Sequence, residues 1–299
     1  MSLIDVVIQE RRRDLGGFQV GRVLPNAKRR TVGPFVFFDH MGPLDFPPGI
    51  PRSVDVRPHP HIGLSTLTYL FAGEIMHRDS IGSEQPIKSG EVNWMTAGRG
   101  ITHSERFERA RQEGGHMNGI QAWVALPAEH EETEPEFLHY ETVQLPVLEE
   151  SGVHIRVIAG EAYGAKAPVR IYSPLFYVRC ELLAGATLQL PVNYSERAAF
   201  VVTGDVGAAA TALSTGEMAV FTPGADVALT AQTDSTLMLL GGEPLGERFI
   251  EWNFVSSSKE RIEQAKADWR AGRMKLPVFD DKEFIPLPGE AVPSANPMS

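Results

Sequence analysis

The segment from His59 to Glu105 reads "HPHIGLSTLTYLFAGEIMHRDSIGSEQPIKSGEVNWMTAGRGITHSE", and the rest of the chain is interpreted outward from it. It opens with His59 and His61 and closes with His103 and Glu105, so each end carries two metal-ligand side chains two residues apart. Residues i and i+2 of an extended strand face the same side. Two such strands that meet inside a barrel would aim three imidazoles and one carboxylate at one point, which predicts a metal site.

The residue types of these pairs restrict the kind of site. Neutral imidazole and carboxylate suit Fe, Mn, Co, Ni, Cu and Zn, and the absence of a thiolate excludes a structural zinc finger. Four protein ligands on an ion that accepts about five or six leave open coordination positions, which a catalytic site needs. The spacing therefore predicts a catalytic metal centre without identifying the metal.

The sequence around this segment consists of short apolar runs separated by Gly, Pro and Asn, a pattern typical of an all-β sandwich or barrel. Two blocks share one organisation: "STLTYLFAGEI" with "SGEVNWMTAG", and "RAAFVVTGDV" with "TGEMAVFTPG". Their likeness indicates an internal duplication of one barrel. We place the boundary near residue 145, which predicts a metal-binding barrel over residues 1–145 and a second domain over residues 146–299.

One helix is predicted near residues 257–271. Ser257 and Glu260 suggest a capping box, and Gly272 marks the end of the helix. Three apolar residues recur at helical spacing, namely Ile262, Ala265 and Trp269. The Pro-rich tail beyond the helix is expected to be irregular, and its last ten residues are expected to be disordered.

Composition excludes several classes of partner. The net charge of −10 argues against binding to nucleic acid or to an anionic membrane surface, and the run Arg11–Arg13 is expected to be a solvated face. The single cysteine, Cys180, cannot form an intrachain disulfide and is expected to be a buried, inert thiol. No apolar run approaches the ~18 residues of a membrane span, and the N-terminus lacks the order of a secretory signal. These features predict a cytoplasmic protein.

Other side chains have less specific interpretations. We expect His40, His77 and His116 to be hydrogen-bonded or surface residues, with a place lining the metal cavity as the alternative for His77 and His116. We expect His130, His139 and His154 to lie at the surface. Four apolar residues are candidates for the cavity wall, although strand periodicity alone predicts barrel core for each: Phe37, Leu64, Met76 and Trp94.

The central segment resembles the signature of pirins, which are members of the cupin superfamily. "GPFVFFDHMGP", "GIQAWVALP" and "GGEPLGERFIEWNFVSSSKERIEQAKADWRAGRM" also look like pirin segments, so the resemblance covers nearly the whole chain. It implies a bicupin, that is, two antiparallel jelly-roll β-barrels facing each other, here with a C-terminal helix. It also implies a metal on His59, His61, His103 and Glu105, with iron the first candidate, and a second barrel that binds no metal.

The resemblance implies two classes of function. Some pirins resemble quercetinases, which suggests a quercetin 2,3-dioxygenase-type oxidoreductase that opens flavonols with O2, with Glu105 as general base. Pirins are also described as regulators, which suggests a non-enzymatic metal or redox sensor that binds a metabolic enzyme or a transcription factor. A metal-stabilised bicupin with an unknown small-molecule substrate is a third interpretation. A monomer is expected, because a bicupin already pairs two barrels within one chain.

Overall fold

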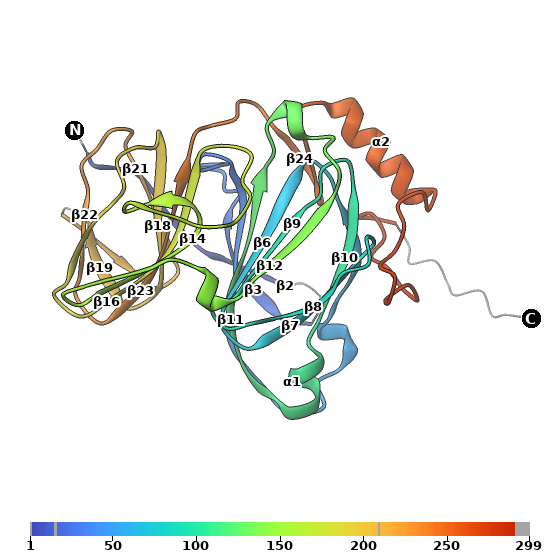
Figure 1. The fold of residues 1–299 in the computed structure, drawn as a ribbon, viewed down its shortest axis with the longest axis horizontal. Coiled ribbons are helices and arrows are strands. Elements are labelled where there is room, and N and C mark those ends of the chain that lie inside the picture. The colour runs from blue at the N-terminus through green and yellow to red at the C-terminus, as the bar shows by residue number, and fades with distance from the viewer. Residues whose placement is uncertain (1, 15–16, 209, 291–299) are drawn as a thin grey trace, which may run out of the picture.

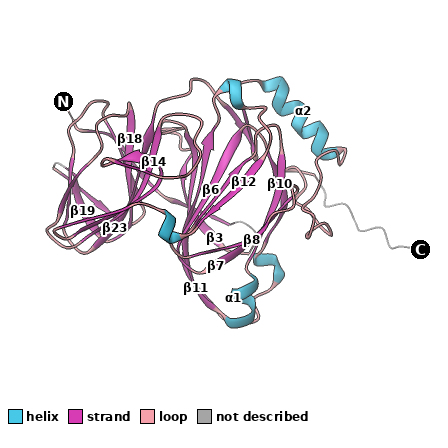
Figure 2. Cartoon of the chain, in the orientation of Figure 1, coloured by secondary structure: helices cyan, strands magenta, loops and turns pink. Residues whose placement is uncertain are grey.

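The computed structural model describes residues 2–14, 17–208 and 210–290, and these residues form mainly antiparallel strands (Figure 2). Two barrels lie side by side, each made of one large and one small sheet (Figure 1). The predicted all-β bicupin is confirmed. No helix among the described residues has the length and apolar character needed to cross a membrane.

The first barrel contains the candidate metal site. Its seven-stranded sheet has the order β12 (Glu136–Tyr140), β9 (Val92–Thr96), β6 (Leu64–Ala72), β11 (Gly115–Ala125), β4 (Phe35–Phe46), β3 (Gln19–Leu24) and β2 (Arg11–Asp14). Its four-stranded sheet has the order β5 (Val56–His61), β10 (Ile101–Arg106), β7 (Glu74–Asp79) and β8 (Glu84–Lys88). The short helix α1 (Glu108–Glu113) and the 3-10 turns Arg52–Val54 and Ala128–His130 connect these strands.

The second barrel has the same two-sheet plan. Its large sheet has the order β1 (Ile4–Gln9), β21 (Glu217–Phe221), β18 (Glu196–Thr203), β23 (Ser235–Gly242), β16 (Leu175–Leu182), β14 (Val153–Ala162) and β13 (Val147–Glu150), with β15 (Ala165–Lys166) paired to β14. Its small sheet has the order β17 (Thr187–Gln189), β22 (Ala228–Ala231), β19 (Asp205–Ala208) and β20 (Thr211–Ser214).

The two large sheets share a hydrophobic core. Leu67 and Tyr69 of β6 belong to it together with Tyr177 of β16 and Phe200 of β18, and all four are fully buried. Alternation along β6 sends the other side chains of that strand into the first barrel, because neighbouring strand residues face opposite sides. The barrels are therefore held together by apolar packing of one sheet on the other.

The interiors of the two barrels differ in chemistry. The second barrel is filled by one continuous apolar cluster that includes the fully buried Cys180, as predicted, and burial raises the pKa of that thiol. In the first barrel two separate apolar clusters contain the inward-facing Leu64 and Leu70 of β6, whereas Thr66 and Thr68 between them are buried polar residues. A polar layer thus lies inside the first barrel.

The expected boundary near residue 145 falls between β12 and β13, and one segment from each side of it packs on the other side's barrel. Strand β1 pairs with β21, at the edge of the second barrel's large sheet. The hairpin of β24 (Phe249–Glu251) and β25 (Phe254–Ser256) lies against the first barrel, where Phe254 bridges Ile62. Figure 1 accordingly shows the N-terminus on the lobe of β18 and β21, and helix α2 on the other lobe.

Helix α2 (Lys259–Arg270) buries Ile262, Ala265 and Trp269, as predicted. The predicted capping residue is wrong by one position. Ser258 caps the helix by accepting from the backbone N–H of Arg261 at 3.2 Å, whereas the backbone N–H of Ser257 donates to the Glu131 carboxylate at 2.9 Å. Ser256, Ser257 and Ser258 are equally suitable N-cap residues by sequence. The contact of Ser257 with the distant Glu131 leaves Ser258 as the residue that caps the helix.

The chain leaves α2 through Gly272, whose φ of +65° is the left-handed conformation expected of a glycine after a helix. The described residues beyond it form turns and irregular structure, with neither helix nor strand. The predicted disorder of the last ten residues falls, for residues 291–299, outside the described residues. The run Arg11–Arg13 is exposed, as expected of a solvated face.

Candidate metal centre

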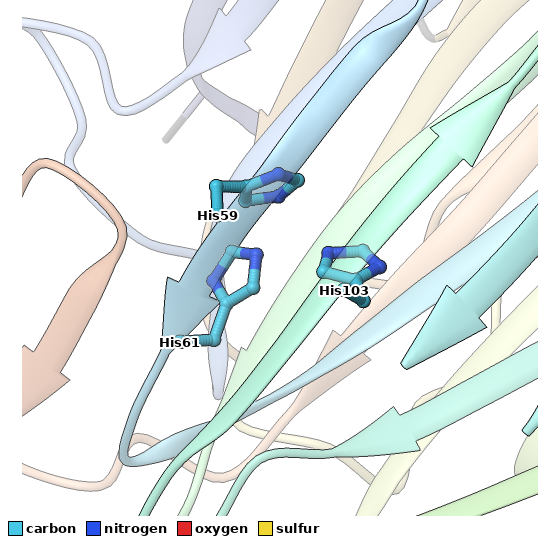
Figure 3. Close-up of side chains that lie close together, drawn as sticks. All are labelled: His59, His61 and His103. Atoms are coloured by element: carbon cyan, nitrogen blue, oxygen red, sulfur yellow. The ribbon is translucent and has the colours of Figure 1, made fainter. Parts of the chain in front are cut away.

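Strands β5 and β10 bring three histidines together. The two strands are antiparallel neighbours, with His103 directly opposite His59 and Ile101 opposite His61. His59 and His61 project to the same side of β5, and one ring nitrogen from each of the three histidines lies within 4.8 Å of the others (Figure 3). The spacing predicted from the sequence therefore does place three imidazoles around one point.

Two glycines of the segment allow the chain to turn closely around this site. Gly63 follows β5 with φ +67°, and a Cβ there would lie 2.0 Å from the Val255 carbonyl oxygen. Gly98 precedes β10 with φ +50°, and a Cβ there would lie 2.0 Å from the Thr133 carbonyl oxygen. Any other residue would clash with backbone at either position, so both glycines are needed for the turns that hold β5 and β10.

Backbone carbonyls fix the tautomers of His59 and His61. The Nδ1 atom of His59 lies 2.9 Å from the Arg57 oxygen, and that of His61 lies 3.1 Å from the Asn253 oxygen. A carbonyl oxygen can only accept, so each Nδ1 carries the proton and each Nε2 keeps a lone pair. The Nε2 of His61 is buried and has no hydrogen-bond partner among the described residues. This arrangement is typical of metal-binding histidines.

The tautomer of His103 is set through two further residues. One oxygen of Asp79 accepts backbone N–H groups of Ile81 and Ser83, at 3.0 and 2.9 Å, and the other lies 3.1 Å from Nε2 of His77. An ionised carboxylate only accepts, so the His77 proton lies on Nε2. His77 Nδ1, 3.3 Å from His103 Nδ1, must then accept from it. The buried Nε2 of His103 is left with a lone pair and no partner among the described residues.

Burial keeps these imidazoles neutral. It lowers the pKa of His59 to about 4 and holds the pKa values of His61 and His103 well below the ordinary range of a histidine. A metal ligand must be the neutral imidazole. The metal-free site is therefore already in the protonation state that binds a metal.

Glu105 lies on the wall of the same cavity but is not part of the three-histidine cluster. Its carboxylate accepts from Nε2 of Gln121 at 3.1 Å, and Gln121 in turn accepts from Thr68 at 2.6 Å. The β5–β10 ladder shifts register between His103 and Glu105, which opposes Glu105 to Val56. Burial raises the pKa of Glu105 to about 7, and the bond from Gln121 opposes that rise. Glu105 thus takes up or releases a proton near neutral pH.

His59, His61 and Glu105 border a cavity of about 700 Å³, whereas His103 is not among its lining residues. Phe37 and Trp123 stack in its wall with ring centroids 4.0 Å apart, and the guanidinium of Arg22 lies 4.5 Å above the Phe37 ring. Residues after α2 also border it, through Glu283 and Ile285. The cavity is therefore bounded by the first barrel, by the turn between β24 and β25 with Trp252 and Asn253, and by the tail.

The four predicted wall residues have different positions. Phe37 lines the cavity, as proposed for it. Leu64 and Trp94 belong to the apolar cores, so for them the alternative interpretation is confirmed. Met76 is partly buried and does not line the cavity.

The remaining histidines mostly follow the expectation of hydrogen-bonded or surface residues. His40 is buried and bonded to Glu10 and Asn118, and His116 is exposed and bonded to Asp45. The alternative that His116 lines the cavity is wrong. His77 is buried and bonded to Asp79 and His103, as expected of a hydrogen-bonded residue, and it is not among the residues that line the cavity. Three others are partly rather than fully exposed: His130, His139 and His154.

Sequence reasoning missed two parts of the site. Asp79 follows His77 by two residues, the same spacing that identified the other pairs, so a signal existed and was overlooked. Gln121 carried no signal, because an isolated Gln in an apolar strand has no local partner and its role depends on β11 lying beside β6.

Comparison with known proteins agrees with this architecture. The family model described as Pirin matches residues 17–124, and the one described as Pirin C-terminal cupin domain matches residues 177–275. A pirin-like protein of Caulobacter vibrioides is 64% identical over 287 residues, covering 96% of this chain and 100% of that protein.

Other similar proteins carry a name that refers to an activity. A Pseudomonas aeruginosa protein is 37% identical over 281 residues, covering 93% of this chain and 87% of that protein, and its name assigns it an unconfirmed quercetin 2,3-dioxygenase activity. The crystal structure of a quercetin 2,3-dioxygenase from Acinetobacter baumannii superposes with a TM-score of 0.86 at 31% identity, covering 97% of this chain and 96% of that one. With two cupin barrels, both family models matched and relatives aligned along almost its full length, the chain belongs to the pirin family.

Proposed function

We propose that the protein is a metal-dependent oxidoreductase of the quercetin 2,3-dioxygenase type, which opens flavonols with O2. The observation that carries the proposal is the convergence of three neutral imidazoles, those of His59, His61 and His103, beside a cavity with aromatic walls that His59 and His61 border. The names of the P. aeruginosa and A. baumannii relatives support the same activity.

We further propose that His59, His61 and His103, with Glu105 as the fourth ligand, hold one divalent transition metal. The donor set fits such an ion, because two buried Nε2 atoms lack any partner among the described residues and all three tautomers leave a lone pair at Nε2. Iron is the first candidate, and Mn, Co, Ni, Cu or Zn would suit the same ligands. A bacterial pirin of Escherichia coli has been crystallised with nickel(II).

The cavity suits a flat aromatic substrate. Its volume of about 700 Å³ falls within the range of ~300–1,000 Å³ usual for small-molecule sites. The stacked rings of Phe37 and Trp123 offer an apolar face against which a flavonol can lie.

Glu105 is the proposed general base. A bound divalent metal would supply Lewis-acid stabilisation of the deprotonated 3-hydroxyl of a flavonol. Glu105 accepts the hydroxyl proton, and a pKa near 7 suits a base that works at neutral pH. Gln121 donates to one carboxylate oxygen and so holds Glu105 against the cavity wall. Net addition of O2 then yields a depside and carbon monoxide.

Anaerobic purification, elemental analysis, quercetin turnover and oxygen uptake together test this proposal. We expect about one equivalent of metal and oxygen uptake that equals flavonol loss. His59→Ala should abolish both metal and turnover, because it removes one ligand. His116→Ala is the matched control, since His116 is exposed and outside the cavity.

Two outcomes would count against the proposal. Turnover that survives loss of the metal would refute the metal-dependent mechanism. A stoichiometric metal with no turnover of flavonols would favour instead the regulator that binds a partner protein.

A further inference from the structure

The wall beside the histidines carries a cation on the same strand. Arg57 lies in β5 two residues before His59 and four before His61, within the register shift of the β5–β10 ladder. All three line the cavity, together with Arg52 from the 3-10 turn just before β5. A positively charged group is therefore built into the same wall as the proposed metal ligands.

The acidic side chains of this cavity already have cationic partners. Asp39 receives two bonds of 2.8 Å from Arg22. Asp55 accepts from Arg111 at 2.6 Å. Glu283 accepts from Arg106 at 3.0 Å. Apart from Glu105, each carboxylate in the wall is thus neutralised by a neighbour.

Arg52 and Arg57 have no such partner. Neither guanidinium makes a hydrogen bond or ion pair with any of the residues that the structure describes. Arg57 is partly buried, so the desolvation of its charge is not offset by a carboxylate of this chain. Around the proposed metal the cavity therefore carries two unpaired positive charges, in a chain whose net charge is −10.

We propose that the natural substrate carries an anionic oxygen group, such as a carboxylate, which Arg57 and Arg52 bind while another substrate oxygen faces the metal site. The inference rests on the proposed metal site and narrows its substrate class. Arg57 and His59 line the same cavity from one strand, so a single substrate can reach both side chains. The guanidinium forms charge-assisted, often bidentate bonds to such a group. A cavity with local positive charge also concentrates anions from solution.

Binding to the zinc-loaded protein without oxygen tests this directly. The probes are 3-hydroxyflavone and its 3′-carboxylate, whose equilibrium Kd values are measured by fluorescence. We expect the carboxylate to bind about tenfold more tightly at low salt, the size of one charge-assisted bond. Arg57→Gln should remove most of this preference, and the double variant Arg52→Gln/Arg57→Gln should remove all of it. Arg30→Gln, at an exposed arginine outside the cavity, is the matched control and keeps the preference.

Salt dependence of the unmodified protein gives a measurement that needs no variant. The preference should shrink as ionic strength rises, because screening weakens exposed charge pairs. Equal Kd values for the two probes, or a preference unchanged in the double variant, would overturn the inference. The binding test excludes oxygen, so its result does not depend on turnover. If the protein prefers the carboxylate but, with the metal it was purified with, turns over neither probe in air, the dioxygenase proposal is refuted while this inference is supported.

Discussion

At the scale of single residues, the centre depends on where each imidazole keeps its proton. Carbonyl groups settle this for His59 and His61, and a carboxylate settles it for His103 through His77. The strand spacing predicted which histidines would meet. It contained no information on tautomers, because those depend on partners such as Asn253 that are distant in sequence.

Asp79→Asn should reverse this chain of tautomers. The amide oxygen can keep the bonds from Ile81 and Ser83, and its NH2 group then faces His77 Nε2 as a donor. His77 would move its proton to Nδ1, and His103 would move its own to Nε2, where it blocks metal binding. We expect metal affinity to fall by about 10–100-fold with the fold intact.

Chelator competition measures that affinity, and ¹⁵N NMR of the histidines reports the tautomers. Asp45→Asn is the control, since it alters an Asp–His pair outside the cavity. Unchanged affinity in Asp79→Asn, with His103 still protonated at Nδ1, would refute the assignment.

Acid should destabilise the metal-free protein. His59 has a folded pKa of about 4 against an ordinary value of 6.5, so between these values the unfolded state binds more protons and stability falls as pH falls. The shift corresponds to roughly 3 kcal/mol at most. His61 and His103 act in the same direction. The pKa of Glu105 is raised from 4.5 to about 7, so this residue acts in the opposite direction. Its contribution to the pH dependence of stability offsets that of about one histidine.

Urea unfolding of chelator-treated protein at pH 7 and pH 5 checks this linkage. We expect a lower midpoint at pH 5. His103→Gln removes one buried imidazole and should show a shallower pH dependence. A midpoint that rises on acidification would contradict the balance of signs.

At the scale of elements, the segment after α2 is attached to the first barrel at several points. Arg106, almost fully buried in β10, forms two bonds with Asp280, of 2.7 and 2.8 Å, and one with Glu283. The backbone N–H of Ile285 donates to the Pro58 carbonyl at 2.8 Å. Sequence patterns predicted this tail as irregular, and they could not reveal the attachment because it joins residues more than 170 positions apart.

Asp280→Asn combined with Glu283→Gln should loosen this attachment. The buried Arg106 would lose two of its three charged partners and keep Asp55 at 3.5 Å, at an expected cost of about 3 kcal/mol. Proteolysis after α2 should become faster and substrate Kd should rise, because the tail borders the cavity. Arg270→Gln removes an exposed ion pair with Glu290 and should change neither the rate of proteolysis nor the substrate Kd. Unchanged stability and proteolysis in the double variant would show that Arg106 does not anchor the tail.

At the scale of the whole molecule, the duplication was predictable because each barrel repeats the same local succession of strands and turns. The pairing of β1 with β21 of the second barrel was not predictable. The sequence of β1 has no feature that favours β21 over a strand closer in the sequence. The core between the large sheets was likewise outside local patterns, because it joins β6 to strands of the second barrel, such as β16 and β18, that are more than 100 residues away.

Residues 1–145 alone should not form a stable barrel. That fragment would expose the apolar face that includes Phe35, Phe38 and Tyr69, and would leave β1 without its partner. We expect insolubility, or a soluble state that binds hydrophobic dyes and unfolds without a cooperative urea transition. Co-expression with residues 146–299 should restore solubility. A cooperative transition in the isolated fragment would refute the interdependence of the barrels.

The position of strand β1 has a consequence for biosynthesis. Residues 4–9 are made some 200 residues before their partner in residues 217–221, a delay of about 10–40 s at usual rates of translation. Strand β1 must therefore wait unpaired until most of the second barrel has been made. The segment after α2 is made later still, and it docks on the first barrel. A nascent chain halted between the two barrels thus lacks the partner of β1 and the segment that docks on the first barrel.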